Sequence, residues 1–416
     1  MDKKPEKLVP EVRFKGFTDD WEQHKLGKSL SLLKDGTHGS YESVQQGAWL
    51  LSAKNIINNR VVITSNDRKI SENDFKKIHD KFQLRKGDVL LTIVGTIGRS
   101  AILKEANKLT FQRSVAYLRP DENILTSSNF LFSLSKSSNF QNQLKKRTVI
   151  SAQPGIYLSD IDKLNITIPE LKEEQDKIAS IIITIDNILS LQQRKLEQLK
   201  QLKKAMLQQL FVDKNNKQPT LRFKNFKGDW KQHRLGEIST KVTTKNQSNA
   251  SLPVFTNSAK DGIVNQEKFF DKQIANNTSN YYVVNNNDFV YNPRISKNAP
   301  FGPIRRNTLN KTGIMSPLYY IFSLSHNTDE NFLSFYFLSS KWYKFMYENG
   351  DSGARSDRFA IKDKVFQQMP IKLPLIIEQT EIGKFLNYVN ILISLQQTKL
   401  TQLTTLKKYL LQKMFI

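Results

Sequence analysis

Two stretches of the sequence decide how this chain is organised. Residues 10–27 read PEVRFKGFTDDWEQHKLG and residues 219–236 read PTLRFKNFKGDWKQHRLG, at an offset of 209 positions. Among the residues of the first stretch that recur in the second are Arg13, Phe14, Phe17, Trp21, His24 and Leu26, as Arg222, Phe223, Phe226, Trp230, His233 and Leu235. Because chance does not place so many identities in one order, we infer an internal duplication. We call the two stretches the opening motifs.

A second repeated block closes each copy. At an offset of 204, Glu174-Gln175 recurs as Glu378-Gln379, residues 190–193 recur as 394–397, and Lys203-Lys204 recurs as Lys407-Lys408. The middles, residues 30–168 and 240–373, match poorly. A period near 205 residues is far too long for a solenoid, whose repeats are ~20–50 residues. The sequence therefore predicts two copies of a unit made of one domain and one helix.

The closing blocks predict two long helices. After Pro169 and Pro374, apolar residues recur every three or four positions, which is the spacing of a coiled-coil seam. Each helix would run ~40 residues and therefore ~60 Å. The predicted seam residues are Ile182, Ile185, Leu189, Leu196, Leu199 and Met206 in the first copy and Leu386, Val389, Ile393, Leu400, Leu403 and Leu410 in the second.

The seam is interrupted at the same places in both copies. Gln192 and Lys203 interrupt the first helix, and Gln396 and Lys407 interrupt the second. Polar seam residues cost stability but can set register. A helix with one apolar stripe needs a partner, and copies related by a two-fold axis run antiparallel. We therefore expect an antiparallel coiled coil. Its simplest role is structural, and its functional role would be to fix the distance between two globular domains.

Each divergent middle predicts an α+β domain. In the first, strand-like runs such as residues 88–94 and 164–168 are separated by Gly and Asn, and a helix is predicted over 127–146. The second has similar runs at 288–291 and 318–322 and a helix predicted over 330–347. The expected domains are residues 1–168 and 219–373, the long helices are 169–212 and 374–416, and the linker is 213–218.

The composition restricts the classes of function. Lys and Arg number 63 and Asp and Glu 39, so the formal charge is +24, and such a charge predicts a polyanionic partner, such as nucleic acid or an anionic membrane surface. The chain has no cysteine, which excludes disulfides, cysteine zinc sites, iron–sulfur clusters and a cysteine nucleophile. We find no signal core and no run of ~18–20 apolar residues, so we expect a soluble, cytoplasmic protein.

Basic and amide side chains gather in the predicted loops of both middles. Arg, Asn and Gln can read base edges with paired hydrogen bonds, while Lys and Ser mostly hold phosphates. For any one of these residues, a solvated surface role is an open alternative. The candidate DNA contacts are Thr37, His38, Lys54, Asn55, Arg99, Gln112, Arg113 and Gln153 in the first middle and Lys245, Asn246, Lys260, Asn292, Arg294, Lys297, Arg305, Arg306, Arg355 and Arg358 in the second.

Motifs for catalysis are missing from the sequence. There is no G-x-x-x-x-G-K-[ST] loop for nucleotide phosphates, and the five histidines lack the spacing of metal ligands. Residues 292–294 (NPR) match poorly to the Asn-Pro-Pro-Tyr tetrapeptide of amino-methyltransferases. No nucleophile–base pair is apparent. We therefore expect no cofactor, no metal and no catalysis by this chain alone.

With these features the sequence resembles the specificity subunit of type I restriction-modification enzymes over essentially its whole length. The resemblance rests on the two opening motifs, on residues 86–90 (KGDVL), and on the Glu-Gln pair after a proline at the start of each long helix. Residues 35–38 (DGTH) and 54–56 (KNI) also look like family segments. The second copy departs from the pattern, since it lacks the DGTH loop and has NNND at 285–288 where the first has RKGD at 85–88.

The resemblance implies a fold of two tandem-repeat target recognition domains joined by two long antiparallel coiled-coil helices. It implies that each domain reads one half of a split sequence in double-stranded DNA, and that the helices set the gap and dock two methyltransferase (modification) subunits. Restriction motor-nuclease subunits would join that core. Two such domains suit half-sites about one helical turn (~34–36 Å) apart, and the positive charge would attract the phosphates.

Two other classes of function remain open at this point. A basic coiled-coil scaffold could bind RNA or anionic lipid without sequence preference, and equal affinity for any polyanion would favour it. A self-sufficient nuclease or methyltransferase is disfavoured because the cofactor and metal motifs are missing.

Overall fold

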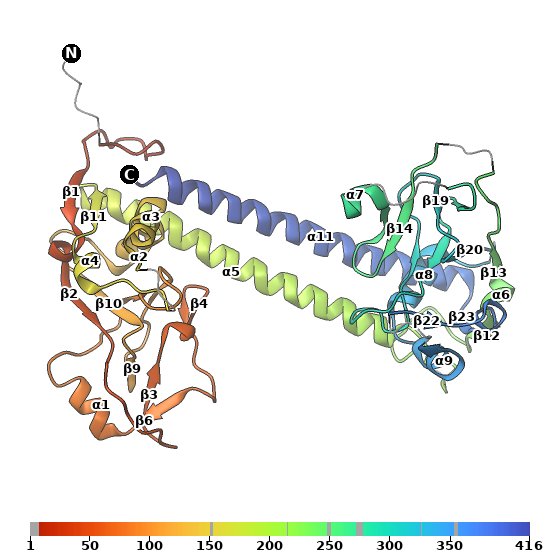
Figure 1. Cartoon of the computed structure of the whole chain (residues 1–416), viewed down its shortest axis with the longest axis horizontal. Coiled ribbons are helices and arrows are strands. Elements are labelled where there is room, and N and C mark those ends of the chain that lie inside the picture. Colours follow the sequence, from red (N-terminus) through yellow and green to blue (C-terminus); the bar gives the residue numbers. More distant parts are fainter. Residues whose placement is uncertain are drawn as a thin grey trace, which may run out of the picture. The chain divides into compact units, whose positions relative to one another are not determined.

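The computed structural model describes residues 8–149, 153–213, 215–247, 251–271, 278–325, 327–352 and 357–416. The chain divides into two compact units. The first unit is Met1–Gln193 with Thr398–Ile416, and the second is Arg194–Gln397. Each unit contains one α+β domain and part of each long helix, α5 (Lys172–Gln209) and α11 (Ile376–Lys413) (Figure 1).

A four-stranded antiparallel sheet organises the first domain. Its strand order is β2-β10-β7-β8, formed by Leu30–Asp35, Val115–Pro120, Val89–Thr92 and Ser100–Ile102. Successive side chains of a strand point to opposite faces, so Val89 and Leu91 of β7 join a core with helix α2 (Ser128–Lys136) while Leu90 joins a second core on the other face. β7 is therefore buried along its whole length.

The other elements of the first domain surround this sheet. A three-stranded sheet has the order β6-β3-β9 and is formed by Arg68–Ile70, Ala48–Leu51 and Leu109–Phe111. Strand pairs are formed by β1 (Glu22–Lys25) with β11 (Asn165–Ile168) and by β4 (Ile56–Ile57) with β5 (Arg60–Val61). The short helices are α1 (Glu72–Ile78), α3 (Ser138–Arg147) and α4 (Leu158–Asp162), with 3₁₀ turns at Leu26–Ser29 and Ala53–Asn55.

The second domain is built around a sheet of the same design. Its order is β13-β20-β17-β18, formed by Ser239–Lys241, Tyr320–Leu324, Phe289–Tyr291 and Ile304–Arg306. The strand pairs are β12 (Lys231–Arg234) with β23 (Pro370–Leu373), β14 (Phe255–Ser258) with β15 (Gly262–Asn265), β16 (Tyr282–Val284) with β19 (Gly313–Met315), and β21 (Asp351–Ser352) with β22 (Phe359–Ala360). The helices are α6 (Leu235–Ile238), α7 (Gln266–Phe270), α8 (Glu330–Leu338), α9 (Tyr343–Asn349) and α10 (Asp363–Phe366).

The two domains share their topology although their sequences diverge. In the first domain β2, which follows the opening motif, pairs with β10, and β10 pairs with β7. In the second domain β13, β20 and β17 pair in the same order. The prediction of two α+β copies joined by two long helices is confirmed.

One element prediction was wrong in the same way in both copies. The single helices predicted over 127–146 and 330–347 are each two helices, interrupted at Ser137 and at Ser339. Both serines have extended backbone, and the Ser137 hydroxyl accepts from the Phe140 N–H at 3.3 Å. Ser137 therefore serves as the N-cap of α3, a position that serine favours, whereas α9 begins only at Tyr343. β20 also begins at Tyr320 rather than at Leu318, which is exposed.

The long helices pack antiparallel within each unit. In the first unit Ile182 and Ile185 of α5 share a core with Leu410 of α11, and in the second Met206 of α5 packs on the core that holds Leu386 of α11. Both helices have 38 residues. Each of the twelve predicted seam residues is buried or half-buried.

Arginines of the opening motifs lock each domain to the start of its long helix. The Arg13 guanidinium donates to both carboxylate oxygens of Glu174, at 2.7 and 2.9 Å. Arg222 does the same to Glu378, at 2.8 Å for both bonds. Such forked, charge-assisted pairs fix geometry as well as adding stability. This duplicated lock gives a physical reason for the recurrence of the opening motif and of the Glu-Gln pair.

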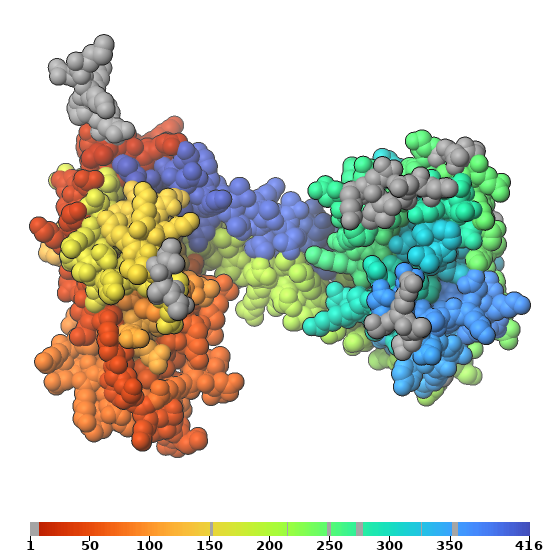
Figure 2. Space-filling model, in the orientation of Figure 1, coloured from red at the N-terminus to blue at the C-terminus, as the bar shows by residue number. Residues whose placement is uncertain are grey.

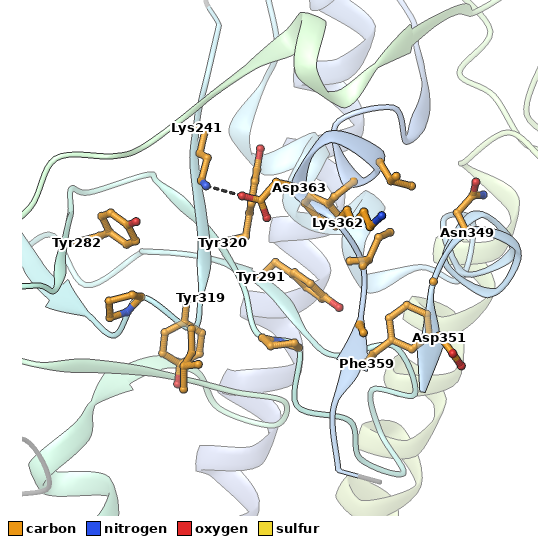
Figure 3. A pocket seen from close by; sticks show the side chains of 18 residues that line it. Lys241, Tyr282, Tyr291, Tyr319, Tyr320, Asn349, Asp351, Phe359, Lys362 and Asp363 are labelled. Atoms are coloured by element: carbon orange, nitrogen blue, oxygen red, sulfur yellow. Dashed lines mark hydrogen bonds and ion pairs between the residues drawn. The ribbon is translucent and has the colours of Figure 1, made fainter. Parts of the chain in front are cut away.

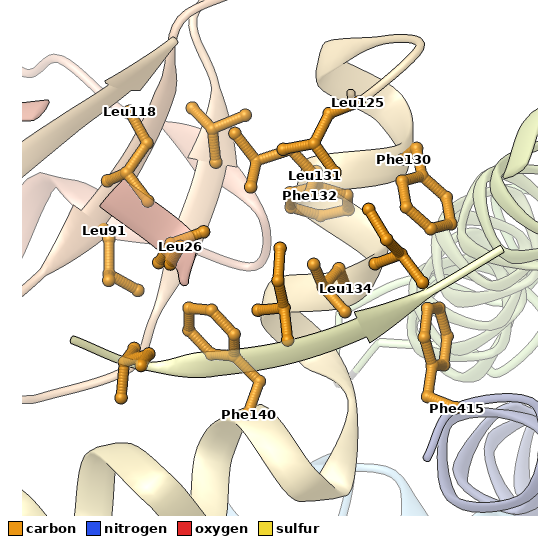
Figure 4. Close-up of a cluster of buried hydrophobic side chains, with 14 of the residues drawn as sticks. Leu26, Leu91, Leu118, Leu125, Phe130, Leu131, Phe132, Leu134, Phe140 and Phe415 are labelled. Atoms are coloured by element: carbon orange, nitrogen blue, oxygen red, sulfur yellow. The ribbon is translucent and has the colours of Figure 1, made fainter. Parts of the chain in front are cut away.

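Each domain core also receives the last turn of a long helix. Phe415, which follows α11, enters the core of the first unit, where the centre of its ring lies 6.3 Å from that of Phe130 (Figure 4). Phe211, which follows α5, lies 5.1 Å from the Phe332 ring in the second unit. The Val12 N–H donates to the carbonyl of Lys413, and Figure 2 shows this end of α11 (blue) against the N-terminal segment (red).

Candidate nucleic-acid interface

Backbone hydrogen bonds bring two candidate loops of the first domain together. The Thr37 N–H donates to the carbonyl of Phe111 at 2.9 Å, and the Arg113 N–H donates to the carbonyl of Thr37 at 3.0 Å. Gly36 makes this approach possible, because a Cβ there would lie 2.2 Å from the Phe111 oxygen. Thr37, His38, Gln112 and Arg113 therefore share one edge of the domain. The His38 ring lies 2.6 Å from Asp35 and stays exposed.

The turn that holds Lys54 and Asn55 joins the same edge. The Ala53 N–H donates to the Ser114 hydroxyl at 3.0 Å. Lys54 is exposed and pairs with Asp67 at 3.1 Å. Asn55 is buried, and its amide accepts from the Ser52 N–H and donates to the Val62 carbonyl. Hydrogen bonding from Asn55 lowers the pKa of Asp67 well below its usual range, so Asn55 organises the turn that presents Lys54.

A third loop pair of the first domain adjoins this edge. The Ile93 N–H donates to the carbonyl of Ser114, and the Gly95 N–H donates to the carbonyl of Pro154 at 2.8 Å. Arg99 and Gln153 are exposed in these loops, while Ser151 and Ala152 lie outside the described residues. The described parts of the candidate segments of the first domain are thus joined by hydrogen bonds, and Lys54, Arg99 and Arg113 are exposed on them.

The candidates of the second domain fall into two groups by burial. Lys245, Lys260, Arg294 and Lys297 are exposed. Lys245 forms an isolated backbone β-bridge with Tyr282, and Lys260 lies in the turn between β14 and β15. The Arg294 guanidinium pairs with the Asp357 carboxylate at 3.2 Å, and Arg358 nearby is half-buried.

The other candidates of the second domain serve its interior. Asn246 is buried. The Asn292 amide donates to the Asn257 carbonyl at 2.9 Å and accepts from the Arg294 N–H. Arg305 donates to the Ala259 carbonyl at 2.8 Å and Arg306 to the Asn331 side chain at 2.8 Å. Arg355 lies outside the described residues. These internal bonds position the loops that carry the exposed cations.

The NNND segment that departs from the family pattern folds like its counterpart. The Arg85 N–H donates to Asp88 at 2.7 Å, and the Asn285 N–H donates to Asp288 at 2.7 Å. Gly87 and Asn287 both have positive φ, 98° and 71°, a region that glycine and asparagine tolerate best. The change of sequence therefore leaves the turn intact.

An aromatic cavity of the second domain was not expected from the sequence. It has a volume of about 800 Å³. Figure 3 shows tyrosines from three strands and Phe359 around it, with Lys241 paired to Asp363 at its rim. The tyrosines that line it are Tyr282, Tyr291, Tyr319 and Tyr320. The lining is drawn from β16, β17, β20 and β22, which together span residues 282–360, so no short-range spacing could have revealed the cavity.

Neither a metal centre nor a membrane span is found among the residues that the structure describes. Within those ranges, no group of three or more His, Asp or Glu side chains is arranged to hold a metal ion. No helix in the described ranges is both long enough and apolar enough to cross a bilayer.

Comparison with known proteins gives matches along the whole chain. The family model described as Type I restriction modification DNA specificity domain matches residues 43–201 and 227–405, one match in each copy. A type I restriction enzyme specificity subunit of Methanocaldococcus jannaschii, MjaX, is 26% identical over 415 residues, covering 94% of this chain and 91% of that protein. The EcoBI specificity subunit of Escherichia coli is 25% identical over 170 residues, covering 39% of this chain and 34% of that protein.

Solved structures support the same architecture. The crystal structure of the S subunit of a type I restriction-modification system from M. genitalium superposes with a TM-score of 0.62 at 15% identity, covering 98% of this chain and 99% of that chain. A chain from a structure on complex assembly and conformational transition of the type I R-M system gives 0.53 at 17% identity, covering 98% of both chains. At these identities the likeness is one of fold.

Proposed function

Because the chain belongs to the type I restriction-modification DNA specificity family and is a specificity subunit with two recognition domains, we propose that each domain reads one half of a split DNA sequence. The observation that carries this proposal is the duplication itself. Both copies have the same sheet order and the same arginine lock, while the residues of their loops differ. Copies of one scaffold with different loops suit the reading of two different half-sites.

We propose as the DNA contacts the exposed candidates together with half-buried Thr37, Gln112 and Arg358. In the first domain these are Thr37, His38, Lys54, Arg99, Gln112, Arg113 and Gln153, and in the second Lys245, Lys260, Arg294, Lys297 and Arg358. Arg and Gln on this surface can contact base edges, and Lys can hold phosphates. Asn55, Asn246, Asn292, Arg305 and Arg306 make internal contacts that fit a supporting role in the same loops. The proposed domain limits are residues 1–168 and 219–373.

The two long helices, residues 169–212 and 374–416, are proposed to set the gap between the half-sites and to dock two methyltransferase subunits. Restriction motor-nuclease subunits would join that complex. We further propose that this chain is non-catalytic and acts in the cytoplasm. The family match, which covers both copies and most of both helices, supports this assignment.

Reconstitution with the cognate methyltransferase subunit tests the proposal. The chain alone should bind DNA with a steep salt dependence and leave it unmethylated, while the assembled complex should methylate one split sequence. Methylation of a specific site by the chain alone would refute the non-catalytic role. Equal affinity for DNA, RNA and anionic vesicles, with no site preference after assembly, would instead favour the basic scaffold.

The spacer role has its own test. Inserting one heptad into each long helix, between Gln193 and Arg194 and between Gln397 and Thr398, preserves the seam and adds about 10 Å. The methylated sites should then have the same two half-sites with a gap about three base pairs longer. Altered bases within the half-sites would show that the helices do not act as a spacer.

A further inference from the structure

Two lysines interrupt the apolar seam at equivalent positions of the two copies. Lys407 of α11 lies in the first unit and Lys203 of α5 in the second, and both are half-buried. Lys407 pairs with Asp186. The position equivalent to Asp186 in the other copy is Asn390, and Lys203 makes no ion pair or hydrogen bond with any residue in the described ranges. The lysine is thus repeated although its carboxylate partner is not.

A second cation accompanies each seam lysine. Beside Lys407 is Lys136, which donates to the Ser100 carbonyl at 3.3 Å and lies 5.2 Å from the centre of the Phe132 ring. Burial, together with the charge of Lys407, lowers the pKa of Lys136 to about 8. Beside Lys203 is Arg305, and both burial and the Arg305 charge lower the pKa of Lys203.

The two cation clusters occupy corresponding places in the fold. Ser100 belongs to β8 and Arg305 to β18, which are the edge strands at the same end of the two four-stranded sheets. In each unit, therefore, the cluster lies where the edge strand meets a long helix. Setting the register of the coiled coil requires a polar seam residue but no second cation beside it, and like charges placed together in a partly buried site disfavour their charged forms.

The charges of both clusters are unbalanced in the same sense. In the first unit Lys136, Lys407 and Arg99 face one carboxylate, Asp186. In the second unit neither Lys203 nor Arg305 forms an ion pair with a carboxylate of the described residues, and Arg305 donates to backbone carbonyls instead. Partly buried cations are retained at low cost only when an anion joins them. Two clusters with an excess of about two positive charges each are suited to bind a strong anion.

The surroundings of the clusters identify the kind of anion. Arg99 is itself an exposed residue of the proposed DNA surface. Arg305 holds the carbonyl of Ala259, next to exposed Lys260 in the turn between β14 and β15. Both clusters are therefore continuous with the proposed DNA surface of their own unit, and a DNA phosphodiester is the anion that this surface would bring.

We propose that Lys407 with Lys136, and Lys203 with Arg305, each bind a phosphodiester of the DNA backbone, so that the long helices hold the duplex directly. This inference rests on the proposed DNA-reading function. Phosphate contacts position a protein on DNA without reading its sequence. The sites would therefore contribute equally to cognate and non-cognate binding, and the recognition loops alone would carry the specificity.

Neighbouring lysines provide matched controls for the test. Lys204 and Lys408 are also repeated, but they are exposed. The variants Lys203→Met and Lys407→Met, with Lys204→Met and Lys408→Met as controls, would be assembled with the methyltransferase subunit. Dissociation constants would be measured over a range of salt concentrations, on a duplex with the mapped target and on one without it. Each seam variant should reduce the magnitude of the slope of log K against log salt by about 0.9. It should weaken binding to both duplexes by the same factor, and both changes should be larger than those of its control.

A gain-of-affinity variant separates this effect from misfolding. Asp186→Asn gives the first unit the residue that Asn390 supplies in the second, and it should tighten both duplexes by about two- to fivefold. Unchanged salt slopes in both seam variants, or equal losses in the controls, would overturn the proposal. So would failure of the seam variants to assemble, since a carboxylate of the partner protein would then be the anion. If the unmodified complex shows no target preference, the proposed function itself fails. If the unmodified complex shows the preference but the seam variants bind DNA as it does, only this inference fails.

Discussion

Asp88 of the first domain and Asp288 of the second occupy equivalent turns of the two four-stranded sheets, but only Asp88 has an arginine partner. The Arg119 guanidinium donates to both oxygens of Asp88, at 2.7 and 2.9 Å. By strand register the place of Arg119 is taken by Ser323 in the second domain. Burial then raises the pKa of Asp288 to about 6. The duplicated backbone has been kept while the charges around it have changed.

The same contrast recurs on the long helices. Lys407 pairs with Asp186, whereas the position equivalent to Asp186 in the other copy is Asn390, which carries no charge to pair with Lys203. The locks that hold the scaffold show no such contrast, since Arg13 with Glu174 and Arg222 with Glu378 have nearly identical distances. The arginine pairs that fix each domain to its long helix are therefore duplicated with their partners, while the carboxylate of the Lys407 pair and the arginine of the Asp88 pair are each present in one copy.

The largest expected effect concerns the buried phenylalanine that follows each long helix. Phe415→Ala and Phe211→Ala should each lower the free energy of unfolding by about 3–5 kcal/mol, because a buried ring is replaced by a cavity. Hydrogen exchange should rise in residues 88–120 for Phe415→Ala and in residues 286–324 for Phe211→Ala. Phe415 belongs to the second copy of the sequence but enters the core of the first unit, and Phe211 does the reverse. Faster exchange in residues 286–324 for Phe415→Ala, or in residues 88–120 for Phe211→Ala, would contradict the antiparallel packing.

The paired aspartates predict opposite effects of one substitution. Asp88→Asn leaves Arg119 half-buried without its carboxylate and should destabilise the chain by about 3 kcal/mol. Asp288→Asn removes a poorly solvated charge and should stabilise the second unit at pH 7.5 by about 1–2 kcal/mol, after allowance for solvent screening. Chemical denaturation of the two variants at that pH measures both values, and effects of the same sign would refute the comparison.

The pH dependence of the second variant follows from the raised pKa of Asp288. A carboxyl group whose pKa is higher in the folded state stabilises the fold at low pH, and this stability is lost as the pH rises through about 6. The advantage of Asp288→Asn over wild type should therefore be present above pH 6 and absent below about pH 4. A constant advantage across this range would mean that the asparagine acts through packing.

The smallest expected effect is the one that should be equal in both copies. Arg13→Lys and Arg222→Lys replace a forked pair by a single contact, and each should cost about 1 kcal/mol. Denaturation midpoints of the two variants would measure these costs. If the loss of unfolding free energy differed more than twofold between the two variants, the two arginine pairs would not be equivalent.

The repeated motifs predicted the scaffold because repetition of sequence reported repetition of contacts. Arg13, Glu174 and Gln175 recur together in the second copy, so the duplication and the long helices could be inferred from the amino-acid sequence alone. Helix interruption at Ser137 and Ser339 was missed because serine is tolerated in helices and only the cap geometry reveals its role.

The candidate surfaces could be predicted only as residue types in loops. Burial decides which of them are presented, and burial depends on contacts between distant segments. Asn55 and Asn246 looked equivalent to exposed amides in the sequence, yet both are buried. Conversely, Lys203 and Lys407 were assigned to the seam from their spacing, and only the missing counterpart of Asp186 and the neighbouring cations gave them a second interpretation.

The central claim is that each domain reads one half of the target independently. The most direct measurement is to map methylated positions in DNA exposed to the assembled complex, first with this chain and then with residues 30–168 replaced by the recognition domain of another specificity subunit. We predict a split sequence in which the exchange changes one half and leaves both the other half and the gap unchanged. A change in both halves, or a continuous target, would contradict the account.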